Sequence, residues 1–332
     1  MKLNHAKQVK YLKNQKNIGF NIIDEKQAAE ILKERTYYYK VTCYRKNFRK
    51  NQNGQYENVE FALLNDMAVL DMRLRYLLLQ LTLDLEHVLK TNLINSITNS
   101  NEDGYTILTE FDAHEEAKFI ASLRPGSNRK YQSVQQMLIK NPSSESYDYS
   151  LTSVYNPKIQ PARPMPVWVF LEKAPYNSLI KFLEFYTQNK KPNYKSFQTA
   201  KELLLLGKRI RDSAAHNRPI LLNIGNDIHA GTIKGRISNL VEKEFQNLSI
   251  TPKNTSEYTK YIDCMKNIKV HDIFCLLILH KTYVKSQEIK DKRYVELKEF
   301  VERCSKHAFL YSEHQNLKTV HEFFKQVVHK LN

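Results

Sequence analysis

Apolar residues recur every three or four positions along most of the chain, a period typical of amphipathic α-helices. The longest such stretch covers residues 59–97, where leucines dominate, and it predicts two helices, the second of them long. Asp24, with Gln27 three residues later, has the pattern of a capping box and predicts the start of the first helix of the chain. Further helices are expected in these stretches: a block that begins at Pro166 and has apolar residues in helical spacing through Leu183, one helix over 194–217 that ends before Pro219, and three helices over 257–331.

Between these helices the pattern is weaker. Residues 1–23 form a basic lead-in, residues 98–163 an irregular insertion with short helices, and residues 223–239 a glycine-containing loop. Within the insertion, 122–127 has loop composition and 141–149 is polar and linker-like. We therefore expect an all-α fold with one helical domain over 1–250 and a C-terminal helical extension over 251–332.

The amino-acid composition also favours a helical fold, and it gives the chain a high positive charge. Only 8 Gly and 10 Pro occur in 332 residues, fewer than chains rich in strands and tight turns usually need. The formal net charge is +16, which attracts polyanions: nucleic acid first and an anionic membrane surface second. The plainer alternative is a lysine-rich surface that serves solubility.

Two segments place cations where RNA could touch them. Residues 37–50 interleave tyrosines with Arg45, Lys46 and Arg49, which suits stacking on bases together with phosphate contacts. The same pattern would suit a helix that buries its tyrosines and solvates its cations. Arg73 and Arg75, in the leucine-rich stretch, either line a common cleft with the motif described below or are solvated.

Other chemistries lack support in the sequence. The four cysteines show no C-x-x-C pairing, so neither a zinc cluster nor a disulfide framework is expected, and no metal or cofactor is predicted. No signal peptide and no membrane span are apparent, which predicts a cytoplasmic protein. A Cys-His nucleophile near Cys275 is less plausible than a buried thiol beside a helix-end histidine. Walker, GxGxxG and GxSxG motifs are absent from the sequence.

The segment with the most chemistry is residues 209–219, Arg-Ile-Arg-Asp-Ser-Ala-Ala-His-Asn-Arg-Pro. Asp212 and His216 are four residues apart, so on a helix they share a face and could hydrogen-bond. Arg211 and Arg218 are seven apart and would project on one side. The end of the predicted helix thus collects an imidazole and several guanidinium groups; the full set consists of Arg209, Arg211, Asp212, His216, Asn217 and Arg218.

These groups suffice to cleave RNA without a metal. The ribose 2′-OH attacks its own phosphorus, His216 takes or gives a proton, and Arg211 stabilises the charge on the phosphorane, with Asp212 and Asn217 in orienting roles. One histidine rarely performs both proton transfers, so a second copy of the chain would help, which motivates a homodimer. By itself the Arg-x4-His spacing is weak evidence, because a helix end with surface arginines would show the same pattern.

Several segments together resemble the Abi (abortive-infection, AbiD/AbiF-like) family within the wider HEPN group of helical RNases. The resemblance rests on 71–75 with Glu86 and Lys90, on Pro166-Val167-Trp168 with Glu172, and on 211–218 against an "RN-x-x-AHH-x-R" signature. It implies an HEPN-like helical bundle, catalytic roles for Arg211 and His216, a dimer, and arrest of phage-infected cells. Asp212 and Asn217 depart from the signature, where Asn and a second His are usual.

Two other function classes remain open. A non-catalytic RNA-binding protein could hold a structured RNA on its cationic surface, in which case His216 would be dispensable. A protein-interaction scaffold with incidental basicity would show weak salt dependence and would not carry RNA through purification.

Overall fold

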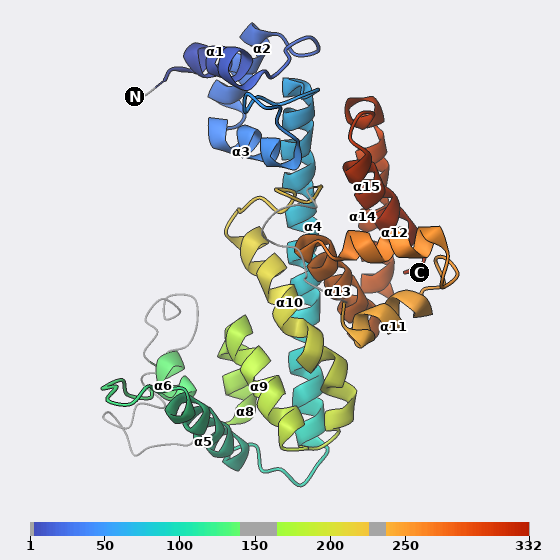
Figure 1. The fold of residues 1–332 in the computed structure, drawn as a ribbon. Helices are drawn as coiled ribbons and strands as arrows, with labels where there is room; N and C mark the ends of the chain where they lie inside the picture. Colours follow the sequence, from blue (N-terminus) through green and yellow to red (C-terminus); the bar gives the residue numbers. More distant parts are fainter. Residues whose placement is uncertain (1–2, 140–164, 226–236, 332) are drawn as a thin grey trace. The chain divides into compact units, whose positions relative to one another are not determined.

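A computed structural model describes residues 3–139, 165–225 and 237–331, and these fold as α-helices with short 3₁₀ turns (Figure 1). Within these ranges two isolated β-bridges occur and no strand forms. The prediction of an all-α fold is confirmed. The contacts divide the chain into two compact units, residues 1–83 with 209–332 (the first unit) and residues 84–208 (the second unit). The proposed division at residue 250 stays a prediction.

The N-terminal segment is more ordered than its composition suggests. The basic lead-in contains a helix, α1, so the prediction that the first helix begins at Asp24 is wrong. Asn4 caps α1 by accepting from the N–H of Lys7, and the apolar side chains of Val9 and Leu12 are buried. The predicted capping box of Asp24 and Gln27 is present at the start of α2. The elements here are α1 (His5–Lys16), α2 (Glu25–Glu34), α3 (Tyr38–Thr42) and the 3₁₀ turn η1 (Cys43–Asn47).

The leucine-rich stretch forms one helix, α4 (Phe61–Thr98), and not the two that were expected. Its 38 residues contain neither Gly nor Pro, so nothing in the sequence interrupts the backbone hydrogen bonds. Leu78, Leu81, Leu85, Leu89 and Leu93 are fully buried, which confirms the helical period read from the sequence.

The second unit is built on an aromatic core. The ring of Phe111 lies 5.3–5.6 Å from the rings of Phe170, Phe182 and Phe185, centroid to centroid. Part of the predicted irregular insertion is therefore regular helix, whereas the loop at 122–127 is as predicted and 141–149 lies outside the described residues. The elements are α5 (Thr106–Ala121), α6 (Val134–Ile139), α8 (Val167–Lys173), α9 (Tyr176–Gln188), a 3₁₀ turn (Tyr194–Phe197) and α10 (Gln198–Ala215), whose last residues belong to the first unit.

The C-terminal part of the first unit holds more helices than predicted. Asn267 and Ser286 each cap the start of a helix, so that the region after 256 contains four α-helices where three were expected. Helices α14 and α15 lie side by side in Figure 1. The elements are α11 (Asn239–Asn247), α12 (Ser256–Met265), α13 (Ile268–Tyr283), α14 (Gln287–Ser305), η4 (Ala308–Tyr311) and α15 (Gln315–His329).

A buried carboxylate joins these C-terminal helices to α4. Asp66 pairs with the guanidinium of Arg303 at 2.6 Å and with Nδ1 of His307 at 2.7 Å, and it accepts from the hydroxyl of Tyr311 at 2.8 Å. Because Asp66 is only 4% exposed, these partners satisfy a charge that water does not reach.

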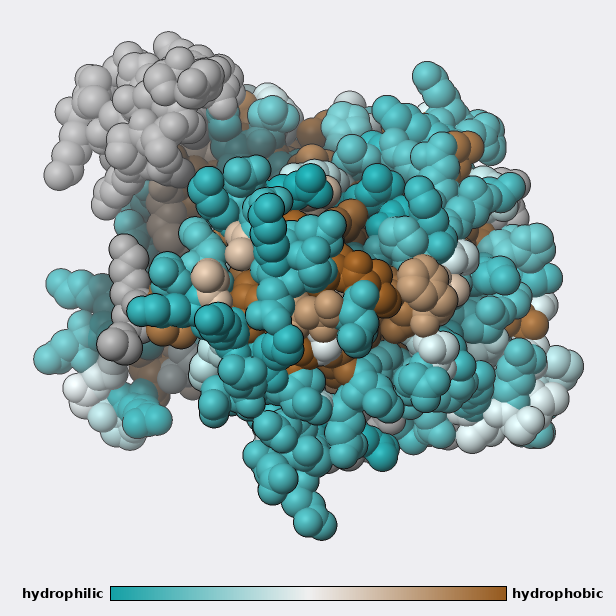
Figure 2. Space-filling model, turned by 90° about the horizontal axis from the view of Figure 1, so that it is seen from above, coloured by the Kyte–Doolittle hydropathy of each residue, from teal (hydrophilic) through white to brown (hydrophobic). Residues whose placement is uncertain are grey.

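The surface seen in Figure 2 is mostly hydrophilic, with apolar residues gathered near the middle of that face. Among the described residues, every helix is either too short or too polar to cross a lipid bilayer.

Candidate functional site

The site predicted from the sequence lies at the C-terminal end of α10. The helix ends at Ala215, two residues earlier than predicted, and Asn217 takes the left-handed conformation with φ of 54°. The N–H of Asn217 bonds the carbonyl of Ala214 at 3.2 Å, and the N–H of Arg218 bonds that of Ser213 at 2.8 Å. This is a Schellman motif, and Asn is, after Gly, the residue that best tolerates its left-handed position.

This early helix end corrects two expectations. Arg218 lies beyond the helix, so the seven-residue spacing does not place it on one helical face with Arg211. Nor does the predicted side-chain bond between Asp212 and His216 form. Instead the backbone N–H of His216 bonds the carbonyl of Asp212 at 3.0 Å, and the carboxylate of Asp212 accepts from Nη1 of Arg211 at 3.3 Å. The neighbouring guanidinium thus competes with the imidazole for the carboxylate.

The motif residues are accessible to solvent. His216 and Arg218 are exposed, and Arg211 and Asp212 are partly exposed. Arg209 lies further back on α10 and contacts the buried carboxylate of Asp272 at 3.4 Å, which ties α10 to α13. The structure therefore presents the histidine at the surface, on a chain segment whose turn is fixed by backbone hydrogen bonds.

A buried ion pair on α4 holds the residue that follows His216. Nε of Arg75 donates to the carboxylate of Asp71 at 2.7 Å, and Nη1 of Arg75 donates to the side-chain oxygen of Asn217. Lys40, on α3, donates to the same oxygen at 3.1 Å and also to the backbone carbonyl of Asn217. Cations at the C-terminal end of a helix are favoured by its unpaired carbonyls and by its dipole.

Asp71 also holds the next part of the chain. Its other carboxylate oxygen accepts from the backbone N–H groups of Ile220 and Leu221, both at 2.7 Å. Asp71 is fully buried and Arg75 is 5% exposed, so both charges are satisfied inside the protein. We call Lys40, Asp71, Arg75 and Asn217 the turn clamp.

Two further side chains extend this support along 219–225. Asn47, at the end of η1, donates to the carbonyl of Leu221 at 2.9 Å and accepts from the N–H of Gly225 at 3.1 Å. Lys269, near the start of α13, donates to the carbonyl of Leu222. The segment 219–225 forms no helix and has one backbone hydrogen bond of its own, from the N–H of Ile224 to the carbonyl of Leu221 at 3.4 Å, so these side chains supply further partners.

Burial perturbs the ionisable groups under this segment. Burial lowers the pKa of Lys40, as does the nearby charge of Arg75, and burial lowers the pKa of Lys269 to about 8. Burial and then the charge of Asp71 raise the pKa of Cys43 to about 11 and that of Tyr44 beyond its ordinary range. Three cations thus surround the single carboxylate of Asp71, which leaves this part of the protein locally positive.

The lowered pKa of Lys269 predicts a pH-dependent stability. Its folded pKa of about 8 lies below the value near 10.5 of an unfolded lysine, so between these values the unfolded chain binds more protons and stability rises with pH. From pH 7.5 to 9 this group should add about 1 kcal/mol to the free energy of unfolding. The raised pKa values of Cys43, Cys275 and Cys304 act in the opposite direction as pH rises toward and past the ordinary thiol value near 9, and they cancel when wild type is compared with a variant of Lys269.

Urea unfolding of wild type and Lys269→Met at pH 7.5 and 9 measures this effect. The variant should lose that increment, whereas Lys266→Met, which changes a lysine that is 38% exposed in its side chain and pairs with Asp263, should keep it. An equal pH dependence in wild type and Lys269→Met would contradict the assignment.

The other cations predicted to touch RNA are dispersed. Nε of Arg45 donates to the carbonyl of Thr42 at 2.7 Å, and its guanidinium lies 5.7 Å from the ring centre of Tyr56. Lys46, Arg49 and Arg73 are exposed. The tyrosines of this segment fit both interpretations of the sequence. Tyr44 is buried, as in a helix that packs its tyrosines inside, whereas Tyr37 and Tyr39 are more than half exposed and could stack on bases.

Other candidate sites gain little from the structure. No group of His, Cys, Asp and Glu in the described ranges could hold a metal ion. The thiol of Cys275 lies 3.8 Å from Nδ1 of His271, but both are buried, and burial raises the pKa of Cys275 strongly. A neutral buried thiol is a poor nucleophile, which agrees with its reading as a core residue.

Sequence reasoning missed the supporting half of this site. Asp71, Lys40, Asn47 and Lys269 were not singled out, and Arg75 was predicted to face RNA, although its described contacts are with Asp71 and Asn217. A polar Asp-x3-Arg pair inside a leucine-rich stretch was the available signal, because charged residues on the apolar side of a helix are buried only when they are paired.

Comparison with known proteins adds one finding. A family model described as Abi-like protein matches residues 30–221, more than half of the chain. Searches of curated proteins and of solved structures found no match. The matched range ends at Leu221, whose N–H is bound by Asp71, so it contains the Arg-x4-His motif and the whole turn clamp. The chain therefore belongs to the Abi-like protein family.

Proposed function

We propose that this Abi-like protein is a metal-independent endoribonuclease that acts in abortive infection, with Arg211 and His216 as its catalytic residues. The observation that carries the proposal is the exposed imidazole of His216 on a backbone fixed from two sides. The Schellman turn fixes it through hydrogen bonds within α10, and the turn clamp fixes the next residue to α3 and α4. A reactive group on a rigid, supported backbone is what general acid-base catalysis needs.

The reaction follows from the residue types. The ribose 2′-oxygen forms a bond to phosphorus, the bond from phosphorus to the 5′-oxygen breaks, and a 2′,3′-cyclic phosphate remains. One proton leaves the 2′-OH and one reaches the departing 5′-oxygen; His216 can perform either transfer, depending on its protonation state. Arg211 would neutralise charge on the phosphorane. DNA has no 2′-OH and should resist cleavage.

The geometry of a single helix favours two copies of the chain. Residues five apart on an α-helix are separated by about 140° around its axis and by about 7.5 Å along it, so Arg211 and His216 project in different directions. A homodimer that apposes the two helix ends would bring a second imidazole to the phosphate, one as base and one as acid. The net charge of +16 would draw RNA to such a site.

Cleavage of total cellular RNA in EDTA by the purified full-length protein tests the proposal. We expect fragments that end in 2′,3′-cyclic phosphate and no cleavage of the matching DNA. If the protein binds RNA tightly in a salt-dependent way yet leaves it intact, the enzyme proposal fails. The chain would then be a non-catalytic RNA-binding protein that holds a structured RNA.

A further inference from the structure

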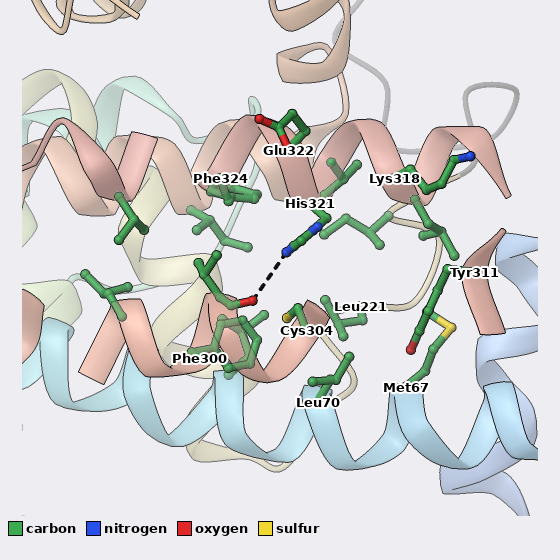
Figure 3. A pocket seen from close by; sticks show the side chains of 18 of the residues that line it. Met67, Leu70, Leu221, Phe300, Cys304, Tyr311, Lys318, His321, Glu322 and Phe324 are labelled. Atoms are coloured by element: carbon green, nitrogen blue, oxygen red, sulfur yellow. Dashed lines mark hydrogen bonds between the residues drawn. The ribbon is translucent and has the colours of Figure 1, made fainter. Parts of the chain in front are cut away.

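The first unit contains a large apolar cavity with no role in the proposed reaction. Its volume is about 460 Å³, within the range of small-molecule sites. One wall is the face of α4 that carries Leu70 and Leu74, and the base is α13 with Ile273 and Leu277. Figure 3 shows α15 on one side of the space and α14 with α4 on the other, with side chains of all three pointing into it.

The lining of this cavity is mostly apolar and offers water few partners. An ordered water needs two to four polar partners, and two of the polar side chains in the lining, those of His321 and Tyr311, already bond other groups of the protein. Nε2 of His321, which points into the space in Figure 3, lies 3.3 Å from the carbonyl of Val301, and the hydroxyl of Tyr311 donates to Asp66. An apolar occupant satisfies the lining better.

The cavity is open to solvent along the α14–α15 side. Phe300, Val301, Leu317 and Phe324 line it and are only partly buried. These side chains would lose contact with water when an apolar molecule filled the space, which favours binding by about 25 cal/mol per Å² of apolar surface covered. The opening therefore provides both an entry path and part of the driving force.

The charged residues at the rim of the cavity determine which polar group an apolar ligand could carry. Lys260 and Lys318 are exposed lining residues, and Lys260 forms no ion pair with any residue in the described ranges. The only carboxylate among the lining residues, Glu322, accepts from Nε2 of Gln326 at 2.6 Å. In Figure 3 Lys318 and Glu322 point away from the space between the helices. Two lysines against one glutamate make the rim of the cavity net positive, and the whole chain carries a net charge of +16. The rim therefore suits an anionic head group.

We propose that this cavity binds a single-chain anionic amphiphile, such as a fatty acid, with its hydrocarbon chain between α4, α14 and α15 and its carboxylate at the lysine rim. Leu221 and Ile224 also line the cavity, so the occupant would contact the segment that the turn clamp holds. The binding site stands independently of the proposed RNase activity.

Titration of the full-length protein with laurate, below its micellar concentration, tests the proposal by calorimetry. We expect saturable binding of one laurate per chain and a rise in melting temperature. Each methylene removed should weaken binding about fourfold, so decanoate should bind roughly 15-fold more weakly than laurate. Lys260→Glu with Lys318→Glu should weaken laurate binding at least tenfold and leave dodecanol binding unchanged.

Two cavity-filling variants and a matched control locate the site. Leu74→Trp, on α4, and Val301→Trp, on α14, should each lower laurate affinity at least tenfold; the second serves if the first does not fold. Tyr76→Trp enlarges a side chain on α4 that is 60% exposed and does not line the cavity, and it should bind laurate as wild type does.

The proposal is overturned if laurate shows no saturable binding, or if folded Leu74→Trp and Val301→Trp both bind it as tightly as wild type. It is also overturned if dodecyltrimethylammonium binds as tightly as laurate. A concentration-dependent dimer that Leu74→Trp disperses, with no laurate binding, would assign the cavity to a second copy of the chain instead.

Discussion

Replacing His216 by alanine is expected to slow RNA cleavage by about 10²–10⁴-fold while leaving the fold and the affinity for RNA nearly unchanged. The factor is the usual contribution of a general acid or base. The imidazole is exposed, so its removal should change the free energy of unfolding by less than about 0.5 kcal/mol. Affinity should persist because phosphate contacts by many cations dominate RNA binding and its salt dependence.

His329 supplies a matched control, because it too is exposed and ends a helix, α15. His329→Ala should cut RNA at the wild-type rate. Single-turnover cleavage of one labelled RNA, together with filter binding of the same RNA, separates the two effects. Arg211→Ala should slow cleavage by about 10²–10³-fold if Arg211 stabilises the phosphorane. Equal cleavage by His216→Ala and wild type would remove the histidine from the mechanism.

Asp71→Ala is expected to cost about 3–5 kcal/mol of the free energy of unfolding, the usual penalty for breaking a buried ion pair by removing one partner. The substitution leaves the buried guanidinium of Arg75 without its carboxylate and leaves the N–H groups of Ile220 and Leu221 without an acceptor. Against a typical total of about 5–15 kcal/mol, such a loss would remove between about a fifth and all of the free energy of unfolding.

Urea unfolding measures this loss, and Asp263→Ala provides the comparison. Asp263 also pairs with a cation, Lys266, at 2.7 Å, but the pair is exposed, so its loss should cost less than about 1 kcal/mol. The double variant Asp71→Leu, Arg75→Met should recover part of the stability, because it removes the unpaired charge as well. A cost for Asp71→Ala as small as that for Asp263→Ala would show that Asp71 is not the centre of the clamp.

The helical class of the fold could be predicted because local signals determine it. The leucine period of α4 and the capping box at Asp24 each lie within a few residues. Errors arose where such signals were weak. Residues 5–16 of the lead-in are mostly polar, with Val9 and Leu12 as the only buried side chains of α1, which hid this helix. The division of 59–97 into two helices was not supported by any Gly or Pro within α4.

The candidate site also has one part that local sequence signals indicate and another that depends on contacts between distant residues. Arg211 and His216 could be proposed from the sequence because they lie five residues apart at a predicted helix end. The turn clamp was not predicted, since Arg75 and Asn217 are 142 positions apart and only the folded chain brings them together. The bond predicted between Asp212 and His216 failed for a related reason: a spacing of four residues permits a contact but does not say that Arg211 competes for the carboxylate.

The pairing of Asp66 with Arg303, His307 and Tyr311 limits how far this protein can be truncated. The Abi-like match ends at Leu221, yet the partners of this carboxylate lie some eighty residues further on. A fragment trimmed to the matched range would present to water the carboxylate of Asp66 and, on the same helix, the leucines that α13, α14 and α15 now face. We therefore expect the smallest autonomous folding unit around the Arg-x4-His motif to be larger than the matched range and to include the C-terminal helices.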